Sequence, residues 1–145
     1  VPVTSTDFYP TFLEAAGAAL MPEQHVDGVS IMPAFQGETF ERGPIYWHYP
    51  HYSNAGDTPA CAVRDGDWKL IEHFEEHRIE LFNLRDDIGE TTDLSTRHPQ
   101  RTRRLHDQLV RWRESIEAQI PQPNPDYADM LAGRIPSPDG LGNIL

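Results

Sequence analysis

The stretch ACAVRDGDWKLIEHFEEHRIELFNL, residues 60–84, decides the fold, because it reads as three short strands joined by two tight turns. Asp65 and Gly66 stand between two segments of alternating apolar and polar residues, a pattern typical of a two-residue hairpin turn. The cross-strand pairs predicted from this turn are Arg64 with Asp67, Val63 with Trp68, Ala62 with Lys69 and Cys61 with Leu70. Because side chains alternate across a strand, the apolar members of these pairs share one face.

A second two-residue turn is predicted at Glu76 and His77. It pairs Phe74 with Ile79 and Glu72 with Leu81, and it puts their apolar side chains on the same face as those of the first hairpin. A longer loop remains an alternative, because this turn type favours glycine where His77 stands. The opposite face mixes charged with apolar residues, which is typical of a surface that is partly solvated or covered by a partner; these residues are Arg64, Asp67, Lys69, His73 and Glu80 with Ile71, Phe82 and Leu84.

Residues 98–120 carry the clearest helical pattern, and burying its apolar stripe on the apolar face of the hairpins would form the core. The stripe comprises Leu105, Leu109, Trp112, Ile116 and Ile120. The rest of the helix is rich in arginine, at Arg101, Arg103, Arg104, Arg111 and Arg113. We favour a solvated basic face opposite an acidic sheet rim over an anion-binding site, because runs of charge are usually surface.

The segment IYWHYPHY, residues 45–52, is aromatic and strand-like, and Pro50 confines its end to a sheet edge or a bend. Flat rings with polar tips beside a loop are typical of a carbohydrate or aryl site, while packing of the sheet edge is the alternative. His48 and His51 fall on opposite faces of an extended strand, so binding one metal together would need a bend. Hydrogen-bonded histidines are therefore favoured over metal ligands.

Residues 1–20 predict a helix with a buried stripe of Phe8, Phe12, Leu13 and Ala16, ended by Gly17. Residues 21–44 read as loop. Residues 121–145 are rich in proline and glycine, which predicts an extended arm.

Length, net charge and the distribution of apolar residues exclude some classes of function. At 145 residues the chain is long enough for one domain, and its net charge of −11 argues against a nucleic-acid partner. The sequence contains no run of about 20 apolar residues, so it predicts no membrane span. The chain shows neither a start methionine nor a signal peptide, so we expect it to be a piece of a longer protein.

Candidates for chemistry are few. Cys61 cannot form an internal disulfide, and its place on the apolar hairpin face predicts a small core residue rather than a reactive thiolate. The acidic residues of the 85–97 segment invite a calcium interpretation, but their spacing misses the EF-hand pattern, so capping or solvated carboxylates are favoured; they are Asp86, Asp87, Glu90 and Asp93.

One resemblance covers about residues 1–127. The ordered set TDFYPTFLEAAG, DGVSIMPAFQG, IYWHYPHY, AVRDGDWKLIEHF, IELFNLRDDIGETTDL, a long helix and PQPNPDY resembles the C-terminal part of the formylglycine-dependent sulfatases of the arylsulfatase type. The resemblance implies an α+β fold, a four-stranded antiparallel sheet packed on one long C-terminal helix. It further implies that residues 1–41 are the trailing helix and segment of a catalytic α/β domain, 42–120 the C-terminal subdomain and 121–145 a tail.

The resemblance also implies that the parent protein hydrolyses aryl or carbohydrate sulfate esters, with formylglycine and calcium supplied by a catalytic domain outside this chain. Around Cys61 the formylglycine motif fails, because Val63 stands where proline is needed and Asp65 where arginine is needed. The chain alone is therefore expected to be inactive, with no metal of its own. In the family the aromatic strand lies near the substrate entrance, which makes His48, His51, Trp47 and Tyr49 the candidates for substrate contact.

Partners implied by the resemblance are the missing catalytic domain and a sulfated small molecule or carbohydrate, in a periplasmic or secreted protein. Without that domain, the apolar residues of 1–41 are expected to fold back on the sheet or to enter an oligomer interface. The alternative function is a non-catalytic carbohydrate-binding or interaction module.

Overall fold

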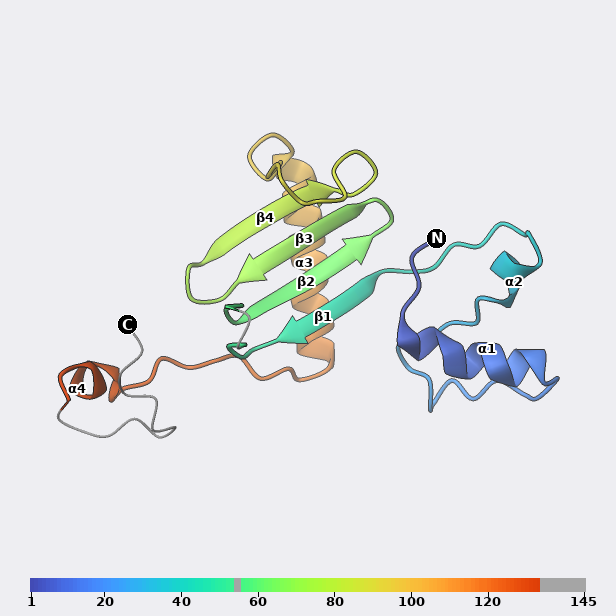
Figure 1. The fold of residues 1–145 in the computed structure, drawn as a ribbon, viewed down its shortest axis with the longest axis horizontal. Coiled ribbons are helices and arrows are strands. Elements are labelled where there is room, and N and C mark those ends of the chain that lie inside the picture. Colours follow the sequence, from blue (N-terminus) through green and yellow to red (C-terminus); the bar gives the residue numbers. More distant parts are fainter. Residues whose placement is uncertain (54–55, 134–145) are drawn as a thin grey trace.

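The structure, a computed structural model, describes residues 1–53 and 56–133. Four strands form one antiparallel sheet in the order β1-β2-β3-β4: β1 (Ile45–Tyr49), β2 (Ala60–Asp65), β3 (Trp68–His73) and β4 (Arg78–Asn83). The long helix α3 (Pro99–Ser115) crosses one face of this sheet (Figure 1). The predicted α+β fold, an antiparallel sheet packed on one long helix, is confirmed.

The first hairpin has the predicted face but not the predicted register. Asp65 pairs with Trp68 and Val63 with Leu70, so the turn residues are Gly66 and Asp67. Positive φ occurs at Gly66 (61°) and not at Asp67, which is the pattern of a type II′ turn, where glycine takes the first central position. The correction shifts the pairing by two residues, and because side chains alternate with a period of two, every side chain keeps its predicted face.

The second hairpin is corrected in the same way. His73 pairs with Arg78 and Leu70 with Leu81, so the connection is a four-residue loop, 74–77, in place of a two-residue turn. His77 takes a positive φ of 49° in this loop. The longer loop weighed from the sequence is therefore the one that forms, and the apolar face is again unchanged.

The core lies between the sheet and α3. Its fully buried members are Cys61, Val63, Leu70 and Leu81 from the strands with Leu105 and Leu109 from the helix. The predicted stripe extends too far, because Ile116 and Ile120 are 50% and 38% exposed. The helix ends at Ser115: the amide of Glu117, at φ 50°, bonds to Glu114 and that of Ala118 bonds to Arg113. This is the Schellman geometry that closes a helix.

The N-terminal segment holds η1 (Ser5–Asp7), α1 (Phe8–Ala15) and the short α2 (Met32–Phe35) in the stretch expected to be loop, and it lies beside the sheet (Figure 1). Gly17 ends α1 with positive φ, as predicted. The predicted stripe is wrong: Phe8 and Phe12 are 49% and 67% exposed, and the buried residues are Asp7, Pro10 and Thr11. The exposed aromatic residues do not fold back on the sheet.

The last described element is the short helix α4 (Tyr127–Leu131), where an extended arm was expected. The rest of that prediction, residues 134–145, lies outside the described part of the chain. Within the described part, no helix is long and apolar enough to cross a membrane.

Candidate substrate-contact face

The edge strand β1 sorts its aromatic residues onto two faces. Tyr46 and His48 point to the α3 side, where Tyr46 stacks on Trp112 with ring centroids 4.6 Å apart. Trp47 and Tyr49 therefore point to the open side of the sheet, where they are 44% and 47% exposed. The alternation of the strand thus splits the aromatic cluster into a structural half and an accessible half.

Small residues of the next strand leave the accessible rings uncovered. Trp47 pairs with Ala62 and Tyr49 with Ala60, so no large side chain of β2 overlaps them. The His51 ring meets Tyr49 edge-on, with centroids 5.5 Å apart. Trp47, Tyr49 and His51 together make up what we call the aromatic face. Rings held in this way can stack on the flat face of a sugar or an aryl group.

Tyr52, in the loop after β1, closes one end of this region. Its hydroxyl donates a hydrogen bond to the carboxylate of Glu75, in the loop between β3 and β4. That bond, with burial and the nearby negative charge, raises the pKa of Tyr52 to about 12, so the phenol stays neutral. Tyr52 therefore ties two loops at the same end of the sheet and is not a proton acceptor.

His48 has a structural contact. Its Nε2 atom lies 2.8 Å from the backbone oxygen of Gln119, which can only accept, so Nε2 carries the proton. The ring also meets Phe74 edge-on at 5.8 Å. His48 thus holds β1 to the segment that follows α3, and of the four residues predicted to contact substrate it is the one on the helix side of the sheet.

The polar residues next to the aromatic face are paired among themselves. His73 lies beside Ala60 on β3, and its Nε2 atom is 2.9 Å from Glu80 Oε2. Arg78 contacts both Glu80 and Glu76. This pairing leaves the aromatic residues as the main accessible recognition groups on this part of the sheet.

Cys61 lies in the core, as predicted, with 1% of its surface exposed. Burial raises the pKa of its thiol to about 11, and Arg113 nearby offsets only part of this effect. At neutral pH the group is a protonated thiol without access to substrate. Cys61 therefore does not serve as a nucleophile.

The acidic loop after β4 stabilises its own backbone. Hydrogen bonds from the amides of Thr91 and Thr92 lower the pKa of Asp87, and Asp93 accepts from the amides of Leu81 and Ser95. Glu90 binds Lys69 at 2.7 Å. Over the described residues, no group of three His, Cys, Asp or Glu side chains could hold a metal ion. These carboxylates order the loop by accepting hydrogen bonds from its own amides and from Leu81, and helix capping is not seen, because His98 at the start of α3 has no side-chain cap bond.

The arginines of α3 face acidic residues of the sheet. Arg104 lies 3.0 Å from Asp65, and Arg113 lies 2.6 Å from Glu72. Arg101 stacks over the ring of Trp68 at 4.1 Å. Arg104, 56% exposed, fits the predicted solvated basic face opposite an acidic sheet rim, whereas Arg113 is only 14% exposed and packs against the sheet.

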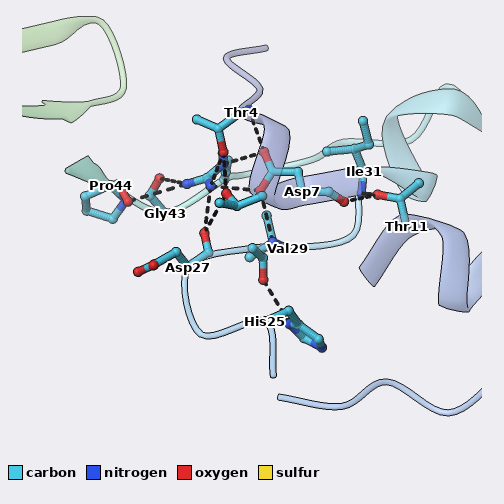
Figure 2. A network of polar contacts seen from close by, with 12 residues as sticks. Thr4, Asp7, Thr11, His25, Asp27, Val29, Ile31, Gly43 and Pro44 are labelled. Carbon is cyan, nitrogen blue, oxygen red and sulfur yellow. Dashed lines mark hydrogen bonds and ion pairs between the residues drawn. The ribbon is translucent and has the colours of Figure 1, made fainter. Parts of the chain in front are cut away.

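A buried ion pair escaped the sequence analysis. Asp7 and Arg42 lie 2.8 Å apart with side chains that are 0% and 4% exposed, and Figure 2 shows Asp7 at the centre of their network. Asp7 ends η1 and also accepts a hydrogen bond from the amide of Thr4. No local pattern connects it with an arginine 35 residues later.

Comparisons with known proteins agree with this fold. The family described as N-sulphoglucosamine sulphohydrolase, C-terminal, matches residues 2–115. A sulfatase from Formosa agariphila is 36% identical over 107 residues, which are 67% of this chain and 19% of that protein. Arylsulfatase K from Mus musculus is 29% identical over 116 residues, 74% of this chain and 20% of that protein.

Among solved structures, Ps i-CgsB superposes with a TM-score of 0.60 at 32% identity, over 77% of this chain and 24% of that one. The chain spans about a fifth of the length of the two curated relatives. Since the family match extends over residues 2–115, the chain belongs to the N-sulphoglucosamine sulphohydrolase C-terminal family and has the fold of the C-terminal part of a sulfatase.

Proposed function

We propose that this chain is the C-terminal portion of an enzyme that hydrolyses sulfate esters of carbohydrates or aryl alcohols. The observation that carries the proposal is the family match over residues 2–115 in a chain that spans about a fifth of its sulfatase relatives. The remaining four-fifths of such a protein would hold the reaction centre.

Under this proposal, the nucleophile and the metal come from the part of the enzyme outside this chain. Two observations support that assignment. The thiol of Cys61 is buried in the core, and Val63 and Asp65 break the formylglycine motif around it. The carboxylates of the acidic loop are occupied by backbone amides and by Lys69. Formylglycine and calcium are therefore expected in the catalytic domain.

The share of this chain in substrate recognition is the aromatic face. Trp47 and Tyr49 offer exposed rings above small alanines, and His51 adds a polar edge. The structure of Ps i-CgsB in complex with k-i-k-neocarrahexaose, 28% identical to this chain with a TM-score of 0.62, supports a carbohydrate as the ligand class. His48 serves this surface indirectly, by fixing β1 to Gln119.

The catalytic domain is also the partner we propose for the N-terminal segment. Phe8 and Phe12 of α1 and Phe35 of α2 are 49%, 67% and 72% exposed, an unusual exposure for large aromatic residues. Covering them with the catalytic domain would bury this apolar surface, and an oligomer interface through residues 1–41 is the other candidate. Secretion or export to a periplasm is the location we propose, following the family.

A second function, a non-catalytic carbohydrate-binding module, is favoured by the same exposed pair, Trp47 and Tyr49. The two functions differ in one measurable property, the release of inorganic sulfate. A binding module would bind glycans with the aromatic face and release none.

The test uses the full-length protein that contains this chain, with 4-nitrophenyl sulfate and k-i-k-neocarrahexaose as substrates. Trp47→Ala is expected to raise KM for the oligosaccharide about tenfold, equivalent to ~1.4 kcal/mol, with little change in kcat. Ile88→Ala is the control, because Ile88 is 78% exposed in the acidic loop, away from β1. Sulfate release with no response to Trp47→Ala would remove the aromatic face from the proposal; no sulfate release from either substrate would favour the binding module.

A further inference from the structure

The Asp7–Arg42 pair differs from a surface ion pair in its burial and in its number of hydrogen bonds. The carboxylate Oδ1 atom accepts from Arg42 Nη2 at 2.8 Å and from the amide of Val29 at 3.0 Å. The Oδ2 atom accepts from Arg42 Nε at 2.9 Å and from the amide of Thr4 at 2.9 Å. The contact is bidentate, and both carboxylate oxygens are satisfied in a buried place.

The guanidinium group of Arg42 has further partners from separate parts of the chain. Nη2 also donates to the hydroxyl of Thr4 at 3.2 Å and to the backbone oxygen of Asp27 at 3.0 Å. Nη1 lies 3.4 Å and 3.5 Å from the backbone oxygens of Gly43 and Pro44. The side chain of Arg42 therefore connects the start of the chain, the loop at 27–29 and the entry to β1. Figure 2 shows its partners Thr4, Asp27 and Pro44 around the network.

The buried side of η1 and α1 explains why this connection is polar. Asp7 and Thr11 are one helical turn apart, and each binds an amide of the returning segment: Val29 donates to Asp7 and Ile31 donates to Thr11. Thr11 in turn donates to the backbone oxygen of Asp7. The helix thus presents acceptors to an extended segment, and Arg42 fastens that assembly to the residues that precede the sheet.

Arg42 is also close to the aromatic face along the chain and in space. It stands three positions before the first residue of β1 and five before Trp47. A cleft of about 450 Å³ lies at this edge of the sheet, and its lining includes Arg42, Asp27 and Thr6 together with Trp47 and Trp112. Arg42 therefore belongs to the lining of the same cleft as Trp47.

We infer that Arg42, held by Asp7, is a positioning residue that fixes β1 and its aromatic face relative to the N-terminal segment. The inference rests on the proposed function, because it assigns Arg42 to substrate recognition through Trp47. Arg42 itself has its donors committed to protein oxygens, so it acts through the strand and does not bind the sulfate. Lysine cannot replace it, because an ammonium group lacks the planar fork that makes the two parallel bonds.

The test compares Arg42→Lys with Arg85→Lys in the full-length protein. Arg85 also pairs with an aspartate, Asp67, but its side chain is 72% exposed, so it controls for loss of an arginine–aspartate contact at the surface. With k-i-k-neocarrahexaose, Arg42→Lys is expected to raise KM at least fivefold. With 4-nitrophenyl sulfate, which carries only one small ring beside its sulfate group, kcat and KM should stay within twofold. Arg85→Lys should leave kcat and KM unchanged for both substrates.

Hydrogen exchange provides a readout that does not depend on activity. Arg42→Lys and Asp7→Asn should both speed exchange at the amides of Thr4 and Val29, which donate to Asp7, and leave the amides of the β2–β3 hairpin unchanged. Unchanged exchange at the amides of Thr4 and Val29 would show that the Asp7–Arg42 pair does not hold the N-terminal segment in place. A parallel fall of kcat for both substrates would overturn the positioning role and assign the pair to stability alone.

The two readouts separate the inference from the proposed function. If the full-length protein releases no sulfate from either substrate, the proposed function fails and the recognition role of Arg42 fails with it. Hydrogen exchange then still tests whether the Asp7–Arg42 pair holds the N-terminal segment in place. If sulfate is released and Arg42→Lys behaves like Arg85→Lys with both substrates, the proposed function stands and the positioning role is wrong.

Discussion

Replacement of Leu109 by alanine tests the packing of α3 on the sheet. Leu109 is fully buried among Val63, Leu70, Leu81 and Leu105. The three carbon atoms removed contribute about 2.4 kcal/mol, at roughly 0.8 kcal/mol per buried CH₂ group. The cavity left behind raises the expected loss of unfolding free energy to about 3 to 4 kcal/mol, since the fixed sheet on one side limits collapse.

Ile116→Ala is the matched control on the same helical stripe. Ile116 continues the apolar spacing of α3, but it follows the last helical residue and is 50% exposed. Its loss should be about 1 kcal/mol or less. Urea unfolding of the 145-residue chain, followed by circular dichroism, measures both variants, and the slope with urea should not change. Equal losses for the two variants would refute the packing described for α3.

Three further outcomes follow from buried groups. The thiol of Cys61, with its pKa raised to about 11 by burial, should react with a thiol reagent only in urea; fast reaction in buffer would contradict its place in the core. Asp7 has a lowered pKa in the folded chain, because hydrogen bonds from Arg42 and two amides outweigh the effect of burial; its contribution to stability is present above about pH 4 and is lost as pH falls. The urea midpoint, measured at pH 5, 4 and 3, should therefore fall less steeply with decreasing pH in Asp7→Asn than in the unsubstituted chain. The same fall in both would count against the ion pair. Gly28→Ala should be strongly destabilising, because its Cβ would lie 2.1 Å from the backbone oxygen of Thr6, whereas Gly43→Ala has open space; similar melting temperatures for the two would show that this approach is not close.

The sequence predicted faces better than registers. In both hairpins the alternation assigned Val63, Leu70 and Leu81 to the buried face, because a strand has only two faces. The pairing depended on which residue takes positive φ. Asp-Gly was read as the turn, whereas Gly66 takes the first turn position and Asp67 the second. Each error moved the pairing by an even number of residues and so left the core prediction intact.

The N-terminal helix shows where periodicity misleads. Phe8 and Phe12 suggested a buried apolar stripe, but the buried side of this segment carries Asp7, at the end of η1, and Thr11 of α1. These residues are buried because they accept hydrogen bonds from the amides of Val29 and Ile31. Acceptors for amides 20 or more residues away leave no local pattern, and the ion pair with Arg42 is hidden for the same reason.

The role of His48, His51, Trp47 and Tyr49 in substrate contact stays a prediction, but the faces on which they lie can be compared with the sequence. Alternation along β1 is sufficient to separate Trp47 and Tyr49 from His48, and the open side of the sheet confirms that separation. The sequence could not show that His48 is held by Gln119, a residue 71 positions later. It also could not show that Ala60 and Ala62 lie beside the exposed rings, because this depends on the register.

Release of inorganic sulfate from 4-nitrophenyl sulfate tests the central claim most directly, when the full-length protein and the isolated 145-residue chain are measured side by side. The full-length protein is expected to release sulfate and the isolated chain none, because Cys61 is buried in the core and Val63 and Asp65 break the formylglycine motif around it. Sulfate release by the isolated chain would contradict the account.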